Sequence, residues 1–427
     1  MKDINNRKFL RQLFEQAVFA ANPEYLMEKF LPKKPKGRTI VVGAGKAAAQ
    51  MALTLEKLWD KAGYGRLEGA VVTCYGYGQK TRHIDILEAS HPLPDENGLK
   101  ATKKLIALVN NLSEDDLVIA LICGGGSALL PAPLGSLTLR DEIGINKALL
   151  KSGAPIGAMN TIRKHLSQIK GGRLAAYAAP ARVVSFIVSD IPGDNAAQVA
   201  SGPTVADWST RHDAVRLVER YQIDLSTKII DFLKSDAADA PKPDNPIFAS
   251  NEIYIVASAA KSLEQAATFA RAQGIRAVVL ADSIEGEAKE IALMHAAIAC
   301  HVASKNQPFK KPVVMLSGGE TSVTIAGSPG KGGRNSEFLL AFAIAIQGQE
   351  TISALAADTD GIDGSEENAG AFCDGETFLR LKQHGLDATH YLVAHDAWTA
   401  FDKIGDLLVT GPTGTNVNDF RAILVGL

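Results

Sequence analysis

The chain has 427 residues, of which 46% are hydrophobic, and its 45 basic residues nearly balance its 47 acidic ones. A chain of this length exceeds the size at which one hydrophobic core normally keeps growing, so two domains are expected. No long block of either charge sign is present, which excludes nucleic acid and a membrane surface as expected partners. A small-molecule substrate is therefore favoured.

The four cysteines and the first ten residues indicate in which cellular compartment the protein is expected. Cys74, Cys123, Cys300 and Cys373 lie far apart without a CxxC pair, so neither a zinc site nor a disulfide framework is expected. The first ten residues lack the apolar run of a signal peptide, and no stretch reaches the roughly 18 apolar residues of a membrane span. These features predict a cytoplasmic protein.

The predicted elements begin with a helix and continue as an alternation of strands and helices. One helical stripe opens the chain and comprises Phe9, Leu10, Leu13, Phe14, Ala17 and Val18. Buried strands are then expected at 38–42, 70–74, 116–123, 182–190, 253–258 and 276–282, and helices at 46–61, 95–110, 138–151, 161–169 and 285–304. This alternation predicts an α/β protein with a doubly wound, Rossmann-like parallel sheet.

A polar stretch with two prolines, SKNQPFKKP at 304–312, separates this region from one of different texture. We therefore expect an N-terminal domain over 1–305 and a smaller C-terminal α/β domain over 306–427. The Pro-rich segment 236–246 is a second interruption, so the first domain could be discontinuous there.

The first candidate site is the segment VVGAGKAAAQMA at 41–52, which joins a strand to a helix. Gly43 and Gly45 are expected to form the turn, and Lys46 on the first helical turn adds a positive charge that suits a phosphate or carboxylate. A dinucleotide fingerprint is the alternative, but the second strand ends at 73–75 without an acid for a ribose hydroxyl. A solvated surface lysine is the other alternative.

The second candidate is CGGGSALLPAP at 123–133. Gly124, Gly125, Gly126 and Ser127 follow a strand, and three glycines allow backbone amides to close on a ligand. The segment lacks the Lys-Ser/Thr ending of a Walker loop, and a simple tight turn is the alternative.

The third candidate is a pair of carboxylates in VSDIPGDNAAQVASGPT at 188–204. Asp190 and Asp194 flank a Pro-Gly turn after a strand, and hard oxygen ligands on a loop suit Mg²⁺. The alternative for Asp194 is that it caps the following helix.

In the C-terminal region, SGGETSVT at 317–324 and GKGGRNSEF at 330–338 are expected to form two glycine-rich turns on either side of a strand. Gly319 and Glu320 belong to the first turn. The second turn carries Arg334 and Asn335 into a helix, where an arginine can stabilise a transferring phosphoryl group. The alternative is a basic surface loop.

Two further polar loops complete the set of candidate ligand contacts. DTDGIDG at 358–364 contains Asp360 and lacks the glutamate of a calcium loop, and GPTGTNVNDFR at 411–421 contains Asn416. Turn formation is an equally good reading of these carboxylates. His91, which precedes a proline, receives no catalytic assignment, and the missing GxSxG elbow argues against a hydrolase.

Together these glycine-rich blocks resemble, in order, the signature segments of the glycerate 2-kinase family, whose C-terminal part is called MOFRL. The resemblance runs from about Val41 to the C-terminus. It implies a Rossmann-like domain and a smaller α/β domain with the active site in the cleft between them, where ATP and Mg²⁺ drive phosphorylation of D-glycerate to 2-phosphoglycerate. The family's lysine and arginine fall on Lys46 and Arg334, which are the expected catalytic residues.

One segment departs from the family pattern. HDAW at 395–398 stands where relatives more often have an Asn-Asp-Ser/Thr-Tyr-like sequence, which puts any contact of His395 in question. Members of the family also carry the label hydroxypyruvate reductase, because they occur beside true reductases in tartrate or glycerate pathways. A reductase using NAD(P)H and a non-catalytic sensor remain the alternatives, and a homodimer is compatible with the sequence.

Overall fold

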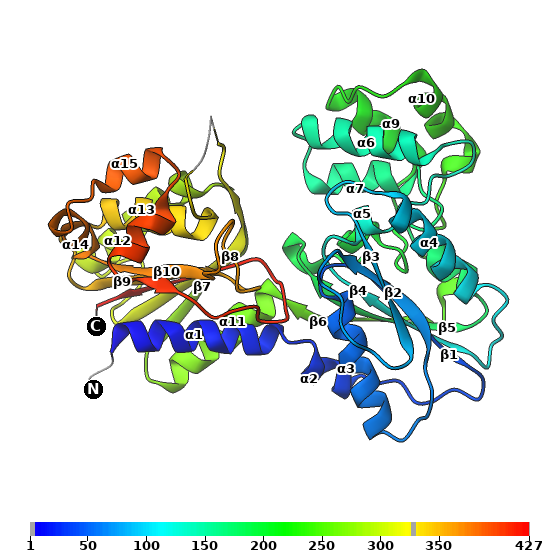
Figure 1. Cartoon of the computed structure of the whole chain (residues 1–427), viewed down its shortest axis with the longest axis horizontal. Coiled ribbons are helices and arrows are strands. Elements are labelled where there is room, and N and C mark those ends of the chain that lie inside the picture. Colours follow the sequence, from blue (N-terminus) through cyan, green and yellow to red (C-terminus); the bar gives the residue numbers. More distant parts are fainter. Residues whose placement is uncertain (1–4, 326–329, 427) are drawn as a thin grey trace. The chain divides into compact units, whose positions relative to one another are not determined.

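The computed structural model describes residues 5–325 and 330–426. These fold into two compact units, one of Pro23–Val256 and one that combines Met1–Asn22 with Ala257–Leu427 (Figure 1). We call them the central unit and the terminal unit.

The central unit is built on one sheet whose strand order is β3-β2-β1-β4-β5-β6. The strands are β1 (Thr39–Ala44), β2 (Glu68–Cys74), β3 (Ile84–Ala89), β4 (Leu117–Ile122), β5 (Arg182–Ser189) and β6 (Glu252–Ser258). The pairings from β3 through β5 are parallel. Every residue of β1 and β4 is buried, as expected for strands covered on both faces. This order is that of the Rossmann fold, so the predicted fold class is confirmed.

Most helices of the central unit connect these strands along the chain, and some of them form an additional helical layer (Figure 1). They are α2 (Glu24–Lys29), α3 (Ala48–Lys61), α4 (Glu96–Val109), α5 (Gly126–Leu129), α6 (Leu139–Lys151), α7 (Ile156–Lys164), α8 (Arg173–Ala178), α9 (Arg211–Arg220) and α10 (Thr227–Lys234). Four of them, α6, α7, α9 and α10, share a core of their own around Leu149, Ile162 and Leu233. Capping boxes at Thr138 and Thr210 fix where α6 and α9 begin.

The terminal unit contains a mixed sheet with the order β11-β10-β9-β12-β8-β7. Its strands are β7 (Arg276–Glu287), β8 (Val313–Ser322), β9 (Ile352–Asp358), β10 (Gly370–Asp374), β11 (Leu407–Leu408) and β12 (Asp419–Val425). β7 and β8 are parallel, whereas β12 runs antiparallel between β8 and β9. β12, near the end of the chain, is therefore one of the two central strands of this sheet.

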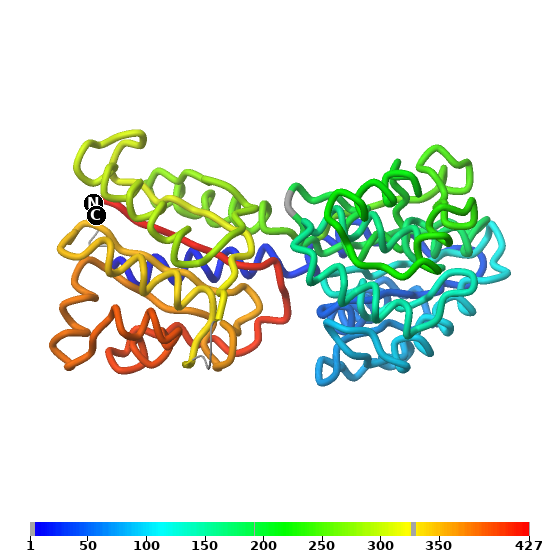
Figure 2. Tube along the Cα trace, turned by 90° about the horizontal axis from the view of Figure 1, so that it is seen from above, coloured from blue at the N-terminus to red at the C-terminus, as the bar shows by residue number. Residues whose placement is uncertain are grey.

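Helices cover both faces of the second sheet (Figures 1 and 2). They are α1 (Asn6–Ala21), α11 (Ala259–Ala272), α12 (Ala288–Lys305), α13 (Arg334–Ala345), α14 (Thr377–Gln383), α15 (Ala388–Val393) and α16 (Ala397–Lys403). α1 and α11 share one core with the sheet, and α12 and α13 share the core on its other face. The predicted apolar stripe of α1 is buried through Phe9, Leu13 and Phe14.

The two units divide the chain differently from the boundary expected near residue 305. β7 and α12 were expected to extend the first sheet, but β7 pairs with β8 in the terminal unit. The opening helix belongs to the terminal unit as well, because its stripe packs on α11 and the second sheet. Strand-helix periodicity is the same on both sides of residue 257, so the sequence carries no signal for which sheet each strand joins.

Several element boundaries also differ. The helix expected at 161–169 is observed at Ile156–Lys164, because Pro155 occupies its N-cap, a position that needs no helical hydrogen bond. The first glycine turn ends two residues later than expected, since α3 begins at Ala48. The segment SGGE, expected as a turn, lies inside β8.

The buried carboxylate of Glu56 generates a stability prediction. Glu56, on α3, is 3% exposed and accepts the backbone N–H groups of Arg82, His83 and Ile84 at 2.8, 2.6 and 2.9 Å. Glu56→Ala leaves these donors without a partner at the start of β3, so we expect the free energy of unfolding to fall by about 3 kcal/mol. Denaturant unfolding followed by circular dichroism measures the change.

Glu68→Ala is the control for this substitution, because Glu68 is exposed at the start of the neighbouring β2. We expect it to change stability by about 0.5 kcal/mol or less. Equal stability of the two variants would contradict the role given to Glu56.

Candidate functional site

Three candidate segments of the central unit meet at the carboxyl ends of β1, β4 and β5. The backbone N–H of Lys46, after β1, donates to Gly124 O at 2.9 Å after β4. A Cβ on Gly124 would lie 2.0 Å from Oδ2 of Asp190, which directly follows β5. β1 and β4 flank the point where the strand order reverses, and ligands of open α/β sheets bind in the crevice at this point.

The glycines of this site are required by packing as well as by any ligand. A Cβ on Gly43 would lie 2.2 Å from Leu121 O, and one on Gly45, whose φ is +136°, would lie 2.3 Å from Cys123 Sγ. A Cβ on Gly126 would lie 2.6 Å from that of Ala200. Gly43 and Gly45 therefore allow β1 to approach β4 closely, a function that differs from the expected turn at the ligand.

Lys46 carries a charge that the described part of the chain does not neutralise. Within residues 5–325 and 330–426, its ammonium makes no hydrogen bond or ion pair. Desolvation and then the charge of Lys46 lower the pKa of His91, while burial raises the pKa of Cys74 against the opposing effect of Lys46. An unpaired cation at this end of the sheet suits an anionic ligand.

Asp190 and Asp194 lie on either side of a tight turn, and their role as metal ligands stays a prediction. The turn between them places Asp194 at a φ of +54°, and the Asp194 N–H donates to Ile191 O at 3.1 Å. Among the described residues, no three His, Cys, Asp or Glu side chains could hold a metal ion together. Asp190 lies beside the glycine loop, so it is a carboxylate of this site.

In the terminal unit, Arg334 lies in a cluster of carboxylates at one edge of the sheet. Its Nε is 2.6 Å from Asp419 Oδ1, its Nη2 is 2.6 Å from Asp358 Oδ2, and its Nη1 is 3.6 Å from Glu320 Oε1. Although desolvation opposes it, Asp419 and Asp358 raise the pKa of Arg334. Arg334 is thus a paired cation, unlike Lys46.

The two carboxylates that hold Arg334 have opposite pKa shifts. Burial raises the pKa of Asp358 well above its usual range, against the effect of Arg334. Asp419 is also buried, but Arg421 and Arg334 hold its pKa below the usual value. Arg421 contacts Asp419 at 2.5 Å and neither side chain is exposed.

The N-terminus of α13 is occupied by a side chain of the protein. Asp363 accepts the backbone N–H of Asn335 at 2.9 Å and that of Ser336 at 2.8 Å. Asn335 is fully buried and donates to Asp419 Oδ1 at 2.8 Å. Asn335, predicted as a ligand contact, therefore lies in the interior, where it positions Asp419.

The remaining candidates of this unit make local contacts. A Cβ on Gly319 would lie 2.2 Å from Ile284 N, so this glycine permits the pairing of β8 with β7. Asp360 Oδ1 accepts from Ile362 N at 2.9 Å, and its Oδ2 accepts from Asn416 Nδ2 at 3.2 Å. Asp360 and Asn416 thus connect the two polar loops to each other, which agrees with the turn-forming alternative.

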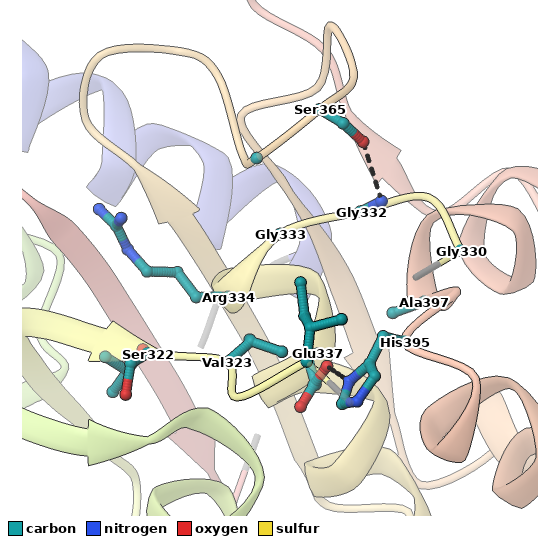
Figure 3. Close-up of a pocket in the computed structure, with 13 residues that line it drawn as sticks. Ser322, Val323, Gly330, Gly332, Gly333, Arg334, Glu337, Ser365, His395 and Ala397 are labelled. Carbon is teal, nitrogen blue, oxygen red and sulfur yellow. Dashed lines mark hydrogen bonds and ion pairs between the residues drawn. The ribbon is translucent and has the colours of Figure 1, made fainter. Parts of the chain in front are cut away.

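A cavity of about 420 Å³ adjoins Arg334, and Figure 3 shows its lining. Glu337 Oε2 accepts a hydrogen bond from His395 Nδ1 at 2.7 Å, whereas Glu337 Oε1 is buried and has no partner among the described residues. His395 has a φ of +52°, a conformation more common for asparagine. The departure at HDAW therefore places a histidine against a buried glutamate in this cavity.

Sequence reasoning missed the groups that support these candidates. Asn160, Arg163 and Ser201 form a hydrogen-bonded chain behind Ser127, while Asp363 caps α13. They lie in ordinary helical or small-residue segments and are assigned only by contacts distant in sequence. The strained backbone of Ser201, at a φ of +61°, leaves no sequence signal either.

Comparison with known proteins places the chain in a family. The model described as "Domain of unknown function (DUF4147)" matches residues 9–234, and that of the MOFRL family matches residues 313–419. A D-glycerate 2-kinase of Thermotoga maritima is 39% identical over 99% of this chain and 98% of its own. An Agrobacterium vitis protein, named provisionally as a hydroxypyruvate reductase, is 48% identical over 99% of this chain and 95% of its own.

A solved structure extends this likeness to three dimensions. The crystal structure of a glycerate kinase from Thermotoga maritima has a TM-score of 0.87 and 39% identity, covering 98% of this chain and 99% of that one. Fold and site thus define a two-part α/β protein with a Rossmann-type unit. The chain belongs to the DUF4147–MOFRL family, whose members include glycerate kinases.

The structure thus brings the predicted site residues together in two groups. Lys46, Asp190 and the 124–127 loop form the group of the central unit, and Arg334, Glu320 and the two polar loops form the group of the terminal unit. The expected meeting of Lys46 and Arg334 in one cleft stays a prediction.

The paired state of Arg334 predicts a large effect on stability. Arg334→Ala leaves Asp358 and Asp419, whose side chains are 6% and 0% exposed, without this cation. We expect the free energy of unfolding to fall by about 3–5 kcal/mol, as measured by denaturant unfolding. Lys331→Ala is the control, because Lys331 is 55% exposed, and it should cost about 1 kcal/mol or less. Similar losses in both variants would rule out a buried charge network.

Proposed function

We propose that this protein is a glycerate 2-kinase that transfers the γ-phosphoryl group of ATP to the 2-hydroxyl of D-glycerate. The observation that carries the proposal is the ammonium of Lys46 at the switch point of the sheet, which has no partner within residues 5–325 and 330–426. The full-length likeness to a D-glycerate 2-kinase supports it.

Phosphoryl transfer needs positioning and charge stabilisation more than covalent chemistry by the protein. The substrate hydroxyl oxygen attacks the γ-phosphorus, the bond to the bridging oxygen breaks, ADP leaves, and the hydroxyl proton is released. Lys46 stabilises the charge on the transferring phosphoryl oxygens, and the side-chain-free loop at Gly124–Gly126 lets the reactants approach the backbone. Arg334 is the second charge-stabilising group that we propose.

Mg²⁺ is proposed to arrive with the nucleotide. This ion usually keeps several waters and binds through one or two carboxylates together with substrate phosphates. Asp190, which lies beside Gly124, is the carboxylate suited to that contact.

The reductase alternative has less support. A dinucleotide site needs an acid at the end of the second strand to bind the ribose. β2 ends at Cys74, and the nearby Glu88 accepts the backbone N–H groups of Gly76 and Gly78 at 3.1 and 3.0 Å. This carboxylate therefore closes the loop after β2.

No described helix is both long and apolar enough to cross a membrane. The cytoplasmic location and the homodimer remain predictions from the sequence.

The proposal is tested with purified protein, D-glycerate, ATP and Mg²⁺. We expect 2-phosphoglycerate, detected through an enolase-coupled assay that does not respond to 3-phosphoglycerate directly. Omission of ATP should abolish the signal. Oxidation of NAD(P)H with hydroxypyruvate, without formation of 2-phosphoglycerate, would instead establish the reductase.

Replacement of Lys46 tests the group that carries the proposal. Lys46→Met removes the charge but keeps most of the side-chain volume, so turnover should fall about a hundredfold or more while the fold is retained. Lys57→Met is the matched control, since Lys57 is exposed on α3, the helix that follows Lys46, and its turnover should stay normal. A Lys46 variant as active as this control would remove Lys46 from the mechanism.

A further inference from the structure

A chain of four side chains supports the glycine loop of the central unit from behind. Ser127 Oγ lies 2.7 Å from Ser201 Oγ, and Ser201 Oγ lies 3.1 Å from Asn160 Oδ1. The same Oδ1 accepts from Arg163 Nη1 at 3.0 Å. Ser201 and Asn160 are 0% and 2% exposed, whereas Ser127 is only partly buried at the open end of the chain.

The donor and acceptor roles in these hydrogen bonds follow from Arg163, at the end opposite Ser127. Arg163 can only donate, so the amide oxygen of Asn160 must face it. The amide nitrogen of Asn160 then faces Gln198 O, to which it donates at 3.0 Å. The amide orientation is therefore fixed by two independent neighbours.

Ser201 has one hydroxyl proton, and the Asn160 oxygen beside it can only accept. Ser201 therefore donates to Asn160 and accepts from Ser127. The proton of Ser127 is consumed in that bond. Ser127 makes no other hydrogen bond within residues 5–325 and 330–426, so its oxygen presents lone pairs alone to a ligand.

The backbone around Ser201 adopts a strained conformation that the surrounding structure must hold in place. Ala200 and Ser201 have φ values of +50° and +61°, and the following Gly202 has +61°. Non-glycine residues keep such conformations only where the surrounding structure holds them, and they concentrate at functional sites. The strained turn places Ser201 Oγ between Ser127 and Asn160.

Arg163 is an unusual anchor for the chain. Its Nε donates to Asn146 Oδ1 at 2.9 Å, and it forms no ion pair within the described residues. Desolvation lowers its pKa to about 10, with Glu142 opposing the shift, so it remains a cation and a donor at neutral pH. Because Arg163 cannot accept a hydrogen bond, Asn160 Oδ1 stays the acceptor toward it.

We propose that Ser127 is a specificity-determining residue that accepts a hydrogen bond from a hydroxyl group of the hydroxy-acid substrate, and that Ser201, Asn160 and Arg163 are positioning residues that keep its oxygen an acceptor. The inference rests on the proposed kinase function and names a recognition group within that site. A substrate hydroxyl can donate a hydrogen bond, whereas ionised phosphate and carboxylate oxygens only accept and would face Lys46 instead.

The test uses two analogues that each lack one hydroxyl of D-glycerate, namely D-lactate and 3-hydroxypropionate. Their inhibition constants against D-glycerate are measured with wild type and with Ser127→Ala. We expect wild type to discriminate against at least one analogue by about tenfold or more, because a site built for a hydroxyl is left unpaired without it. In Ser127→Ala, KM for D-glycerate should rise about tenfold, while the inhibition constant of the analogue that wild type discriminates against should change little. The variant should therefore no longer discriminate between D-glycerate and this analogue.

Ser201→Ala tests the relay. This change frees the Ser127 proton, so the Ser127 hydroxyl can also act as a donor, and discrimination between D-glycerate and the analogue should fall. The double variant Ser127→Ala/Ser201→Ala should show the same discrimination as Ser127→Ala alone. Ser185→Ala is the matched control, since Ser185 on β5 is buried and bonded to Thr204 Oγ1 at 2.8 Å. This variant should lose stability and keep wild-type discrimination, which separates a structural effect from recognition.

Wild-type discrimination in Ser127→Ala, or in Ser201→Ala, would overturn the proposal. Failure of the kinase function is a different outcome, because wild type would then form no 2-phosphoglycerate. Thermal stabilisation of that inactive wild type by D-glycerate, unaltered in Ser127→Ala, would also count against recognition by Ser127.

Discussion

The close approach of β1 to β4 is the constraint on which the candidate site of the central unit depends. Gly43 and Gly45 allow it, because a side chain at either position would overlap the backbone or the sulfur of the neighbouring strand segment. This contact places Lys46 beside the 124–127 loop and fixes both at the strand-order reversal. The loop in turn contacts Asp190 and Ala200, so one packing requirement positions groups from three strands.

The two groups of candidate residues differ in electrostatic design. Lys46 in the central unit has no partner among the residues that the structure describes, whereas Arg334 in the terminal unit is held by Asp358 and Asp419. An unpaired lysine gives its full charge to an incoming anion. A paired arginine costs less to bury and keeps a fixed orientation, since its planar donors are held at two points. Of the two charge-stabilising groups that we propose, Lys46 is therefore the one with an available charge and Arg334 the one with a fixed orientation.

The sequence predicted the fold class because strand-helix alternation and continuous apolar strands are properties of local segments. It also predicted Lys46, Ser127 and Asp190 at strand ends, where a parallel sheet brings them together. It could not predict that α1 and β7 join the second sheet, since apolar periodicity does not specify a partner. The Asp363 cap and the chain behind Ser127 depend on contacts between residues far apart in sequence, for which one chain carries no local signal.

Under the proposed function, the neutral end of the serine chain would let one crevice bind a hydroxyl and a phosphate. A carboxylate at position 127 would also accept a hydrogen bond from the substrate, but its negative charge would repel an anionic ligand. A serine with a freely rotating proton would offer a donor as readily as an acceptor. Fixing that proton through Ser201 and Asn160 gives an acceptor without a negative charge, so the charge of Lys46 would remain available for the phosphoryl transfer that we propose.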